Sequence, residues 1–129
     1  MSGGSNNGAW EVGVLWGLAH YGNPTDYYWD VVSGVSAGAI NTSGAAGWKP
    51  EEVIEMTEFA SDAWLGITTH DIWKVREGVV HILNESSIFD DSPALETIRE
   101  IIMSAKSEYG RRVSVACVDA NTGEYTEFN

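Results

Sequence analysis

The sequence predicts an α/β layer fold, in which helices pack against a sheet. Apolar residues at helical spacing alternate with short strand-like runs along the 129 residues, and this alternation is typical of that fold class. One strand-like run leads through a tight turn directly into a helix of small residues, within 28–46. No repeat, linker or low-complexity tract divides the chain, so we expect residues 1–129 to form a single domain.

The first half of the chain contains a predicted helix, a strand and a second helix. The first helix is indicated by apolar residues at spacings of three and four, which are Val12, Leu15, Trp16 and Ala19. The run 28–33 has the character of a buried strand. Residues 37–46 then predict a helix, which Gly47 is suited to end.

The second half adds two helices and two strands. A helix opens at Pro50, with acids in its first turn, and its apolar face comprises Val53, Met56, Ala60 and Trp64. The stretch 65–84 is ambiguous, with a short helix expected over 71–82. A further helix, which stops near Gly110, is marked by Leu95, Ile98, Ile102 and Ala105. Strands at 111–118 and 124–128 then flank an Asn-Thr-Gly turn, which predicts a hairpin.

A Gly-x-Ser-x-Gly motif occupies the turn between the first strand and its helix, with Ser36 between Gly34 and Gly38. Such a turn lifts the serine hydroxyl outward, and glycines on both sides let the strand and the helix pass closely. We therefore interpret Ser36 as a nucleophile. The alternative is ordinary turn chemistry or a helix N-cap, because serine beside glycine serves both.

A glycine-rich segment at 3–8 precedes the first helix. Acyl transfer through a serine builds negative charge on the carbonyl oxygen, and main-chain N–H groups at a loop and helix N-terminus can hold that charge. We expect an oxyanion hole formed by Gly3, Gly4, Ser5, Gly8 and Ala37. A flexible tail is the structural alternative. A phosphate-binding loop is disfavoured, since neither Gly-Lys-Ser/Thr nor Gly-x-Gly-x-x-Gly is present.

At these residues the chain resembles the patatin-like phospholipase family. The likeness continues through 8–15, 34–41 and 119–124 and spans almost the whole chain. It implies a three-layer α/β/α sandwich and hydrolysis of a lipid acyl ester by a serine–aspartate pair, with no cofactor or metal. In this comparison Ser36 matches the nucleophile, and Gly3, Gly4 and Gly8 match the oxyanion loop.

Two positions depart from the pattern of that family, and the motif that carries its base is absent. Ser5 stands where a third glycine is common, and Asn7 stands where a lysine or arginine is common. The base of the family lies in an Asp-Gly-Gly or Asp-Gly-Ala triplet, whereas no aspartate of this chain is followed by glycine. The aspartates present fit capping and turn roles. Only Met1 and Ser2 precede the glycine-rich loop, where an anchoring strand is expected, and the last predicted strand stops at the end of the sequence. We therefore expect a domain truncated at both ends, with the catalytic aspartate outside this chain.

A Ser-His-Asp triad is the competing catalytic arrangement, because imidazole titrates near neutral pH. His20 ends the first helical pattern, where a cation suits the helix dipole, and His70 and His81 flank another apolar stretch. No histidine follows His81, where an α/β-hydrolase would require one. We expect structural roles for all three.

Composition restricts the partners. A formal charge of −12 with seven lysines and arginines argues against nucleic acid and against simple attraction to anionic lipid. Some of the six tryptophans could seat the protein on a membrane or lipid droplet, although most are expected in the core. The chain has no signal-peptide pattern, which favours a cytoplasmic or peripheral membrane location over secretion. Its one cysteine, Cys117, is expected to be buried.

Two function classes remain. In the first, the protein is a lipid acyl hydrolase of the phospholipase A or acylglycerol lipase type, acting on a lipid ester. In the second, it is a catalytically inactive module that binds lipid or protein. The intact serine motif favours the first class, whereas Asn7 and the missing base favour the second.

Overall fold

The computed structural model describes residues 1–75, 89–105 and 109–129. Its helices are α1 (Asn7–Tyr21), α2 (Ala37–Ala46), α3 (Val53–Gly66) and α5 (Ser92–Ser104). Short 3-10 turns are η1 (Pro24–Tyr27), η2 (Pro50–Glu52) and η3 (Thr69–Asp71). The strands are β1 (Val31–Val35), β2 (Lys74–Val75), β3 (Phe89–Asp90), β4 (Arg112–Val118) and β5 (Tyr125–Phe128).

The main sheet of the described residues has the strand order β1-β4-β5. Strand β1 runs parallel to β4, from the pair Val31–Arg112 to the pair Val35–Ala116. Strands β4 and β5 form the antiparallel hairpin that the Asn-Thr-Gly turn predicted. The crossover between β1 and β4 carries the intervening helices, as a parallel pair requires. A separate short pair joins β2 to β3.

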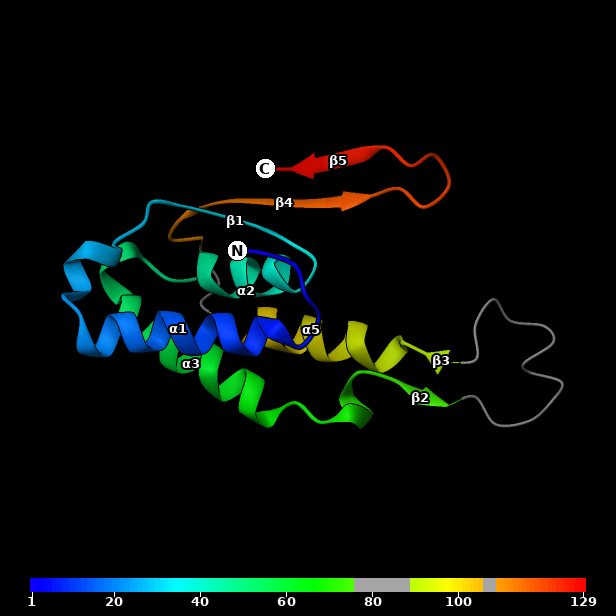
Figure 1. Ribbon diagram of the computed structural model, residues 1–129, viewed down its shortest axis with the longest axis horizontal. Coiled ribbons are helices and arrows are strands. Elements are labelled where there is room, and N and C mark those ends of the chain that lie inside the picture. The colour runs from blue at the N-terminus through cyan, green and yellow to red at the C-terminus, as the bar shows by residue number, and fades with distance from the viewer. Residues whose placement is uncertain (76–88, 106–108) are drawn as a thin grey trace, which may run out of the picture.

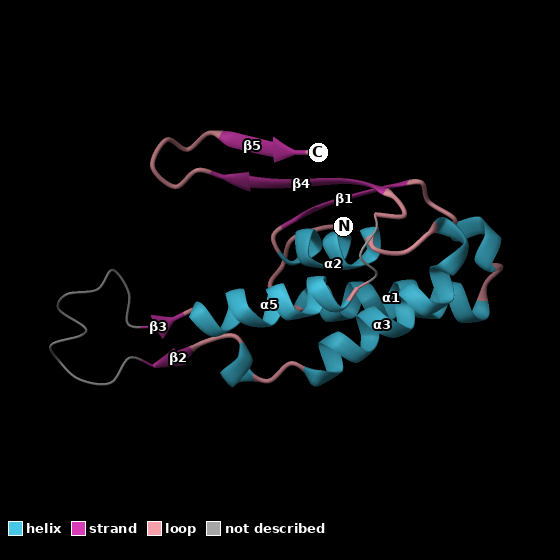
Figure 2. Cartoon of the chain, turned by 180° about the vertical axis from the view of Figure 1, so that it is seen from behind, coloured by secondary structure: helices cyan, strands magenta, loops and turns pink. Residues whose placement is uncertain are grey.

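Helices and strands form layers, with the sheet over α2 and α2 over α1, α3 and α5 (Figure 1). The same order of layers is seen from behind (Figure 2). The α/β class is therefore confirmed. Within the described ranges the helices cover one face of the sheet, so a second helical layer of the expected three-layer sandwich is not seen there. Val31 and Val35 are exposed on the uncovered face.

The core lies where α1, α2 and α3 meet. Its central cluster consists of Ala19, Ala45, Val53 and Met56, with Met1, Tyr27, Trp48 and Ile54 packed against it. Small residues dominate α2, which is buried along most of its length. Because their side chains are short, α2 can lie close to both the sheet and the helices below it.

Most predicted elements form, and their bounds shift. Strand β1 starts at Val31 rather than at residue 28, because Tyr28 still caps η1. Helix α5 begins at Ser92 and ends at Ser104, well before Gly110. The helix expected over 71–82 is not present in its described part, where η3 gives way to β2. The remainder of that prediction falls outside the described residues.

The prediction of a buried Cys117 is wrong, because the thiol is exposed. Strand β1 pairs with β4 only as far as Ala116. Cys117 and Val118 extend beyond that point, and among the described strands they pair with β5 alone. An apolar run indicates a strand. The burial of each residue in it depends on whether a neighbouring strand extends alongside that residue.

Candidate active site

Ser36 occupies a strained turn between β1 and α2. Its backbone has φ 56° and ψ −128°, which is a rare conformation for a residue with a side chain. Ser36 occupies the N-cap position of α2, as the alternative interpretation expected, but its side chain makes no capping hydrogen bond to the helix. A strained strand-to-helix turn is the setting in which Gly-x-Ser-x-Gly presents a nucleophilic hydroxyl.

The two glycines of the motif are required by close backbone approach. A Cβ on Gly34 would overlap the main chain at Gly38 and lie 2.5 Å from Oγ1 of Thr42. A Cβ on Gly38 would overlap the main chain of Met1 and Ser2. Gly34 therefore lets strand and helix pass closely, as expected, whereas Gly38 makes room for the N-terminal segment at Met1 and Ser2.

The glycine-rich segment lies against the serine turn. A Cβ on Gly3 would be 3.0 Å from Cβ and 3.6 Å from Oγ of Ser36. Just before it, Met1 runs beside β1, where its main-chain nitrogen donates to the carbonyl of Ser33 and its carbonyl accepts from Val35 N at 3.4 Å. Packing against β1 and α2 thus brings together two segments about thirty residues apart in the sequence.

The loop holds main-chain N–H groups without protein acceptors. Gly4 has φ 146° and Ser5 has φ 54°, so the chain turns sharply before α1. Within the described residues, no hydrogen bond involves the main-chain nitrogen of Gly3, Gly4, Ser5 or Ala37. An oxyanion hole requires main-chain donors of this kind, without acceptors in the protein.

Gly8 has a different place from the rest of the loop. It is buried in the first turn of α1, and its nitrogen donates to the carbonyl of Ser5 at 3.1 Å. A Cβ there would lie 2.7 Å from Cζ2 of Trp64 and 3.1 Å from Cβ of Ala37. In this conformation Gly8 allows close helix packing, and its amide is not available to an oxyanion.

A cavity of about 660 Å³ opens at Ser36. It lies among α1, α2, α3, η3 and α5, and its walls are mainly apolar. The lining residues are Ser5, Asn6, Ala9, Ser36, Ala37, Ile40, Trp64, Ile67, Thr68, Thr69, Ile72, Trp73, Ala94, Thr97, Ile98 and Ile101. A hydrogen bond of 2.8 Å from Thr97 Oγ1 to the carbonyl of Asp71 joins α5 to η3 at this wall.

No aspartate, glutamate or histidine is among the described residues that line this cavity. Asp71 accepts from the nitrogen and hydroxyl of Thr68, and this hydrogen bonding lowers the pKa of its carboxyl. Asp90 accepts from the nitrogen and hydroxyl of Ser92 at the start of α5. Asp119 accepts from the nitrogens of the two residues 121 and 122. These are the capping and turn roles that the sequence indicated.

The contacts of His20 are those of a structural residue. Its ring stacks on Trp16 with centroids 4.0 Å apart, Nδ1 lies 2.9 Å from the Trp16 carbonyl, and Nε2 lies 3.4 Å from Oε1 of Glu58. His70 lies in η3 and does not line the cavity. His81 lies outside the described residues.

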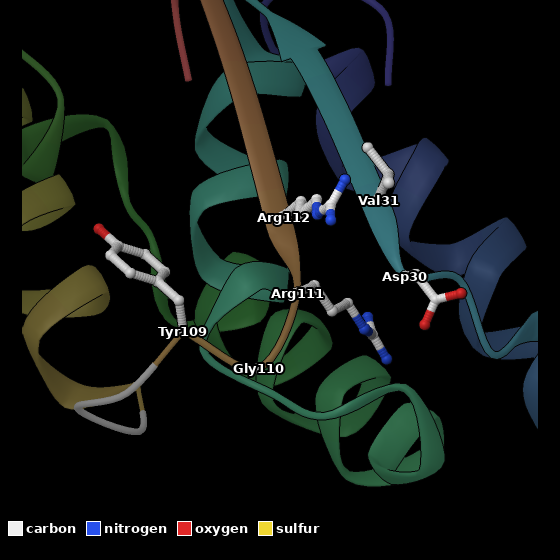
Figure 3. A pocket seen from close by; sticks show the side chains of 6 residues that line it. All are labelled: Asp30, Val31, Tyr109, Gly110, Arg111 and Arg112. Atoms are coloured by element: carbon white, nitrogen blue, oxygen red, sulfur yellow. The ribbon is translucent and has the colours of Figure 1, made fainter.

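A second pocket lies at the opposite end of β1 from Ser36 (Figure 3). Arg111, which is 5% exposed, donates to the carbonyls of Lys49 and Pro50 at 2.9 and 3.3 Å. Burial lowers its pKa, and the charges of Glu51, Glu52 and Asp30 oppose that shift. Because Arg111 joins the start of β4 to the carbonyls of Lys49 and Pro50, we assign it a structural role.

The sequence indicated the serine turn and the loop but not the far wall of the cavity. Ile98 and Ile101 of α5, with Trp73, lie across from Ser36 in the lining. The helical spacing of α5 was visible, and Leu95, expected on the same apolar face, is instead 71% exposed. Spacing gives an apolar face, whereas the orientation of that face depends on the contacts of α5 with α2 and η3.

Comparison with known proteins gives one match. The sequence model of the patatin-like phospholipases matches residues 1–123. Neither the curated proteins nor the solved structures contain a match. In the described ranges, no helix has the length and apolar character needed to cross a bilayer, and no group of three histidine, cysteine, aspartate or glutamate side chains is placed to hold a metal.

Proposed function

The chain belongs to the patatin-like phospholipase family, and from this premise we propose that it carries the nucleophile and oxyanion loop of a lipid acyl hydrolase. The observation behind the proposal is the position of Ser36. Its strained turn packs against Gly3, in a loop whose amides at residues 3–5 have no acceptor among the described residues, and it opens onto an apolar cavity. Each of these features suits attack on the ester of an apolar acyl chain.

In the proposed reaction, Oγ of Ser36 attacks the ester carbonyl carbon and its proton passes to a base. The negative charge on the carbonyl oxygen is held by the N–H groups of Gly3, Gly4, Ser5 and Ala37. When the intermediate collapses, the alcohol leaves with the proton and the acyl group stays on Ser36. Water then attacks the acyl ester with the help of the same base, which releases the fatty acid and restores the serine.

The base in this proposal is an aspartate outside the chain. No carboxylate or imidazole lines the described cavity, and the aspartates near it serve turns and helix ends. Patatin-like proteins are expected to use an aspartate without an intervening histidine. This arrangement requires no metal and no cofactor.

The substrate in this proposal is a phospholipid or acylglycerol ester presented at a lipid surface. The apolar cavity would receive the acyl chain, in a volume that falls within the range of small-molecule sites. Exposed aromatic residues on α1, Trp10 and Tyr21, are suited to the interface between water and lipid. A net charge of −12 favours a neutral or zwitterionic surface over an anionic one.

A second candidate function is a catalytically inactive lipid-binding or protein-binding module. Asn7, in place of a cation, and the absence of an acid from the described cavity lining favour it. Under this alternative the apolar cavity would bind an acyl chain and leave its ester intact.

A fluorophosphonate probe separates the two candidates, because only an activated serine reacts with it. We expect Ser36 to become labelled, at a higher rate in a chain extended at both ends than in the 129-residue chain. Ser36→Ala should abolish labelling, whereas Ser33→Ala, three residues earlier on β1, should retain it. Absence of labelling in both the short and the extended chain would overturn the catalytic proposal in favour of the binding module.

A further inference from the structure

Asn41 makes an unusually complete set of contacts for a side chain near the candidate active site. It lies on α2, five residues after Ser36, and is 6% exposed. Its Nδ2 donates to the carbonyl of Gly8 at 3.1 Å and to Oε2 of Glu11 at 3.0 Å. Its Oδ1 accepts from Nε1 of Trp64 at 2.8 Å. Both amide hydrogens and the carbonyl oxygen are therefore used, which fixes the orientation of the amide.

The contacts continue from Asn41 to the glycine-rich loop. Oε1 of Glu11 accepts from the main-chain nitrogen of Ser2 at 2.9 Å, while Oε2 accepts from Asn41. The next residue after Ser2 is Gly3, whose Cα faces Ser36. A chain of hydrogen bonds thus runs from Trp64 through Asn41 and Glu11 to Ser2, and it spans α3, α2, α1 and the loop.

This chain of hydrogen bonds holds the loop at both of its ends. Ser2 precedes the free amides at residues 3 and 4, and Gly8 follows them in the first turn of α1. Glycines have no side chains of their own to fix their position, and their backbone is the most mobile when unrestrained. The placement of the loop therefore depends on contacts made by its neighbours.

Because the stabilisation of an oxyanion depends on donors within a few tenths of an ångström of their best position, loop placement affects the reaction rate directly. We propose that Asn41 and Glu11 form a polar clasp that positions the amides of Gly3 and Gly4 against Ser36. This inference rests on the proposed function, since it assigns these two side chains to the same site. They are positioning residues, which act through the loop and do not touch the substrate.

Reversing the polarity of the clasp tests the inference. Asn41→Asp places a carboxylate oxygen where Nδ2 lies, facing Oε2 of Glu11 and the carbonyl of Gly8, so attraction becomes repulsion. In the double variant Asn41→Asp with Glu11→Gln, the new amide donates to Asp while its oxygen still accepts from Ser2. The carbonyl of Gly8 remains unsatisfied, and rescue is therefore partial.

Two measurements are made on folded protein. They use the 129-residue chain or the extended chain, whichever the fluorophosphonate labels faster. The first is the rate of fluorophosphonate labelling at Ser36. The second is the NMR order parameter of the Gly3 and Gly4 amides, for which about 0.85 indicates a rigid backbone and below about 0.6 a flexible one. Thr57→Val is the matched control, since it removes a buried hydrogen bond to Ile54 on α3 and lies outside the cavity.

We expect Asn41→Asp to lower the labelling rate at least tenfold and to lower the order parameters of both amides. The double variant should recover part of the labelling rate and part of the order parameters. Thr57→Val should lower the melting temperature and leave the labelling rate of folded protein unchanged. Normal labelling in Asn41→Asp, or no recovery in the double variant, would overturn the clasp while leaving the proposed function intact. No labelling of the wild-type protein overturns the proposed function, and the inference with it.

Discussion

Gly3 lies in van der Waals contact with Ser36, although 32 residues separate them in the sequence. A Cβ on Gly3 would stand 3.0 Å from Cβ of Ser36 and 3.4 Å from the carbonyl of Val35. The loop and the serine turn are therefore packed backbone to side chain. An added methyl group at position 3 would therefore require the loop or the serine to shift by a few tenths of an ångström.

We predict that Gly3→Ala slows fluorophosphonate labelling of Ser36 by about tenfold, because a shift of the loop displaces its amide donors. The change should be accompanied by little loss of stability, since Gly3 is exposed. The rate is measured by gel fluorescence or intact mass against time. A labelling rate equal to that of the wild-type protein would show that loop position does not control the reactivity of Ser36.

Gly13 and Gly17 lie in the interior of α1, where a Cβ would meet nothing within 4 Å. Replacing either glycine with alanine removes backbone freedom from the unfolded chain without a clash. We predict that each change raises the free energy of unfolding by about 0.5–1 kcal/mol. Chemical denaturation checks the prediction, and destabilisation by either variant would indicate a contact at this helix face. Neither variant should change the labelling of Ser36.

Gly34→Ala is expected to be far more disruptive. The added methyl group would overlap the main chain of Gly38 and crowd Thr42, so β1 and α2 would have to separate. We predict a loss of about 3 kcal/mol or more in the free energy of unfolding. Ser33→Ala, at the adjacent and exposed position, is the control and should change stability by less than about 0.5 kcal/mol. Similar melting temperatures for the two variants would contradict the packing described.

Asp90 provides a prediction for acid pH. Its hydrogen bonds from Ser92, with a smaller contribution from Lys74, lower the pKa of its carboxyl from 3.8 to about 2. Because the folded pKa is depressed, the stabilisation is present above pH 3.8 and is lost as the pH falls toward 2. Asp90→Asn should therefore flatten the fall of melting temperature across that range.

The control for this prediction is Asp91→Asn, because the side chain of Asp91 makes no capping hydrogen bond to α5. It should leave the acid dependence of the melting temperature close to that of the wild-type protein. An NMR titration of the Asp90 carboxyl reports its pKa directly. A midpoint near the ordinary value of 3.8 would contradict the assigned hydrogen bonds.

Local patterns predicted most helices and strands. They did not determine which main-chain amides lack hydrogen-bond acceptors or which side chains are exposed. Gly8 illustrates this, since the sequence grouped it with the loop glycines, whereas its nitrogen is bonded to the carbonyl of Ser5. Cys117 shows the same limit for burial, because strand β1 ends before reaching it. Asn41 was not singled out from the sequence, because an asparagine in a helix of small residues carries no local signal for its partners on α1 and α3.

The sequence by itself determined the strand-turn-helix around Ser36 and the need for glycine at position 34, because strain and close approach within a tight turn depend on nearby residues. The need for Gly38 comes from Met1 and Ser2, which tertiary packing brings against it. The tertiary structure alone decided that the loop at 3–5 faces this serine, that Gly8 is excluded from its free amides, and that α5 and η3 form the far wall of the cavity. These relationships join segments distant in the sequence. They arise from packing and hydrogen bonds among four elements, which no local pattern encodes.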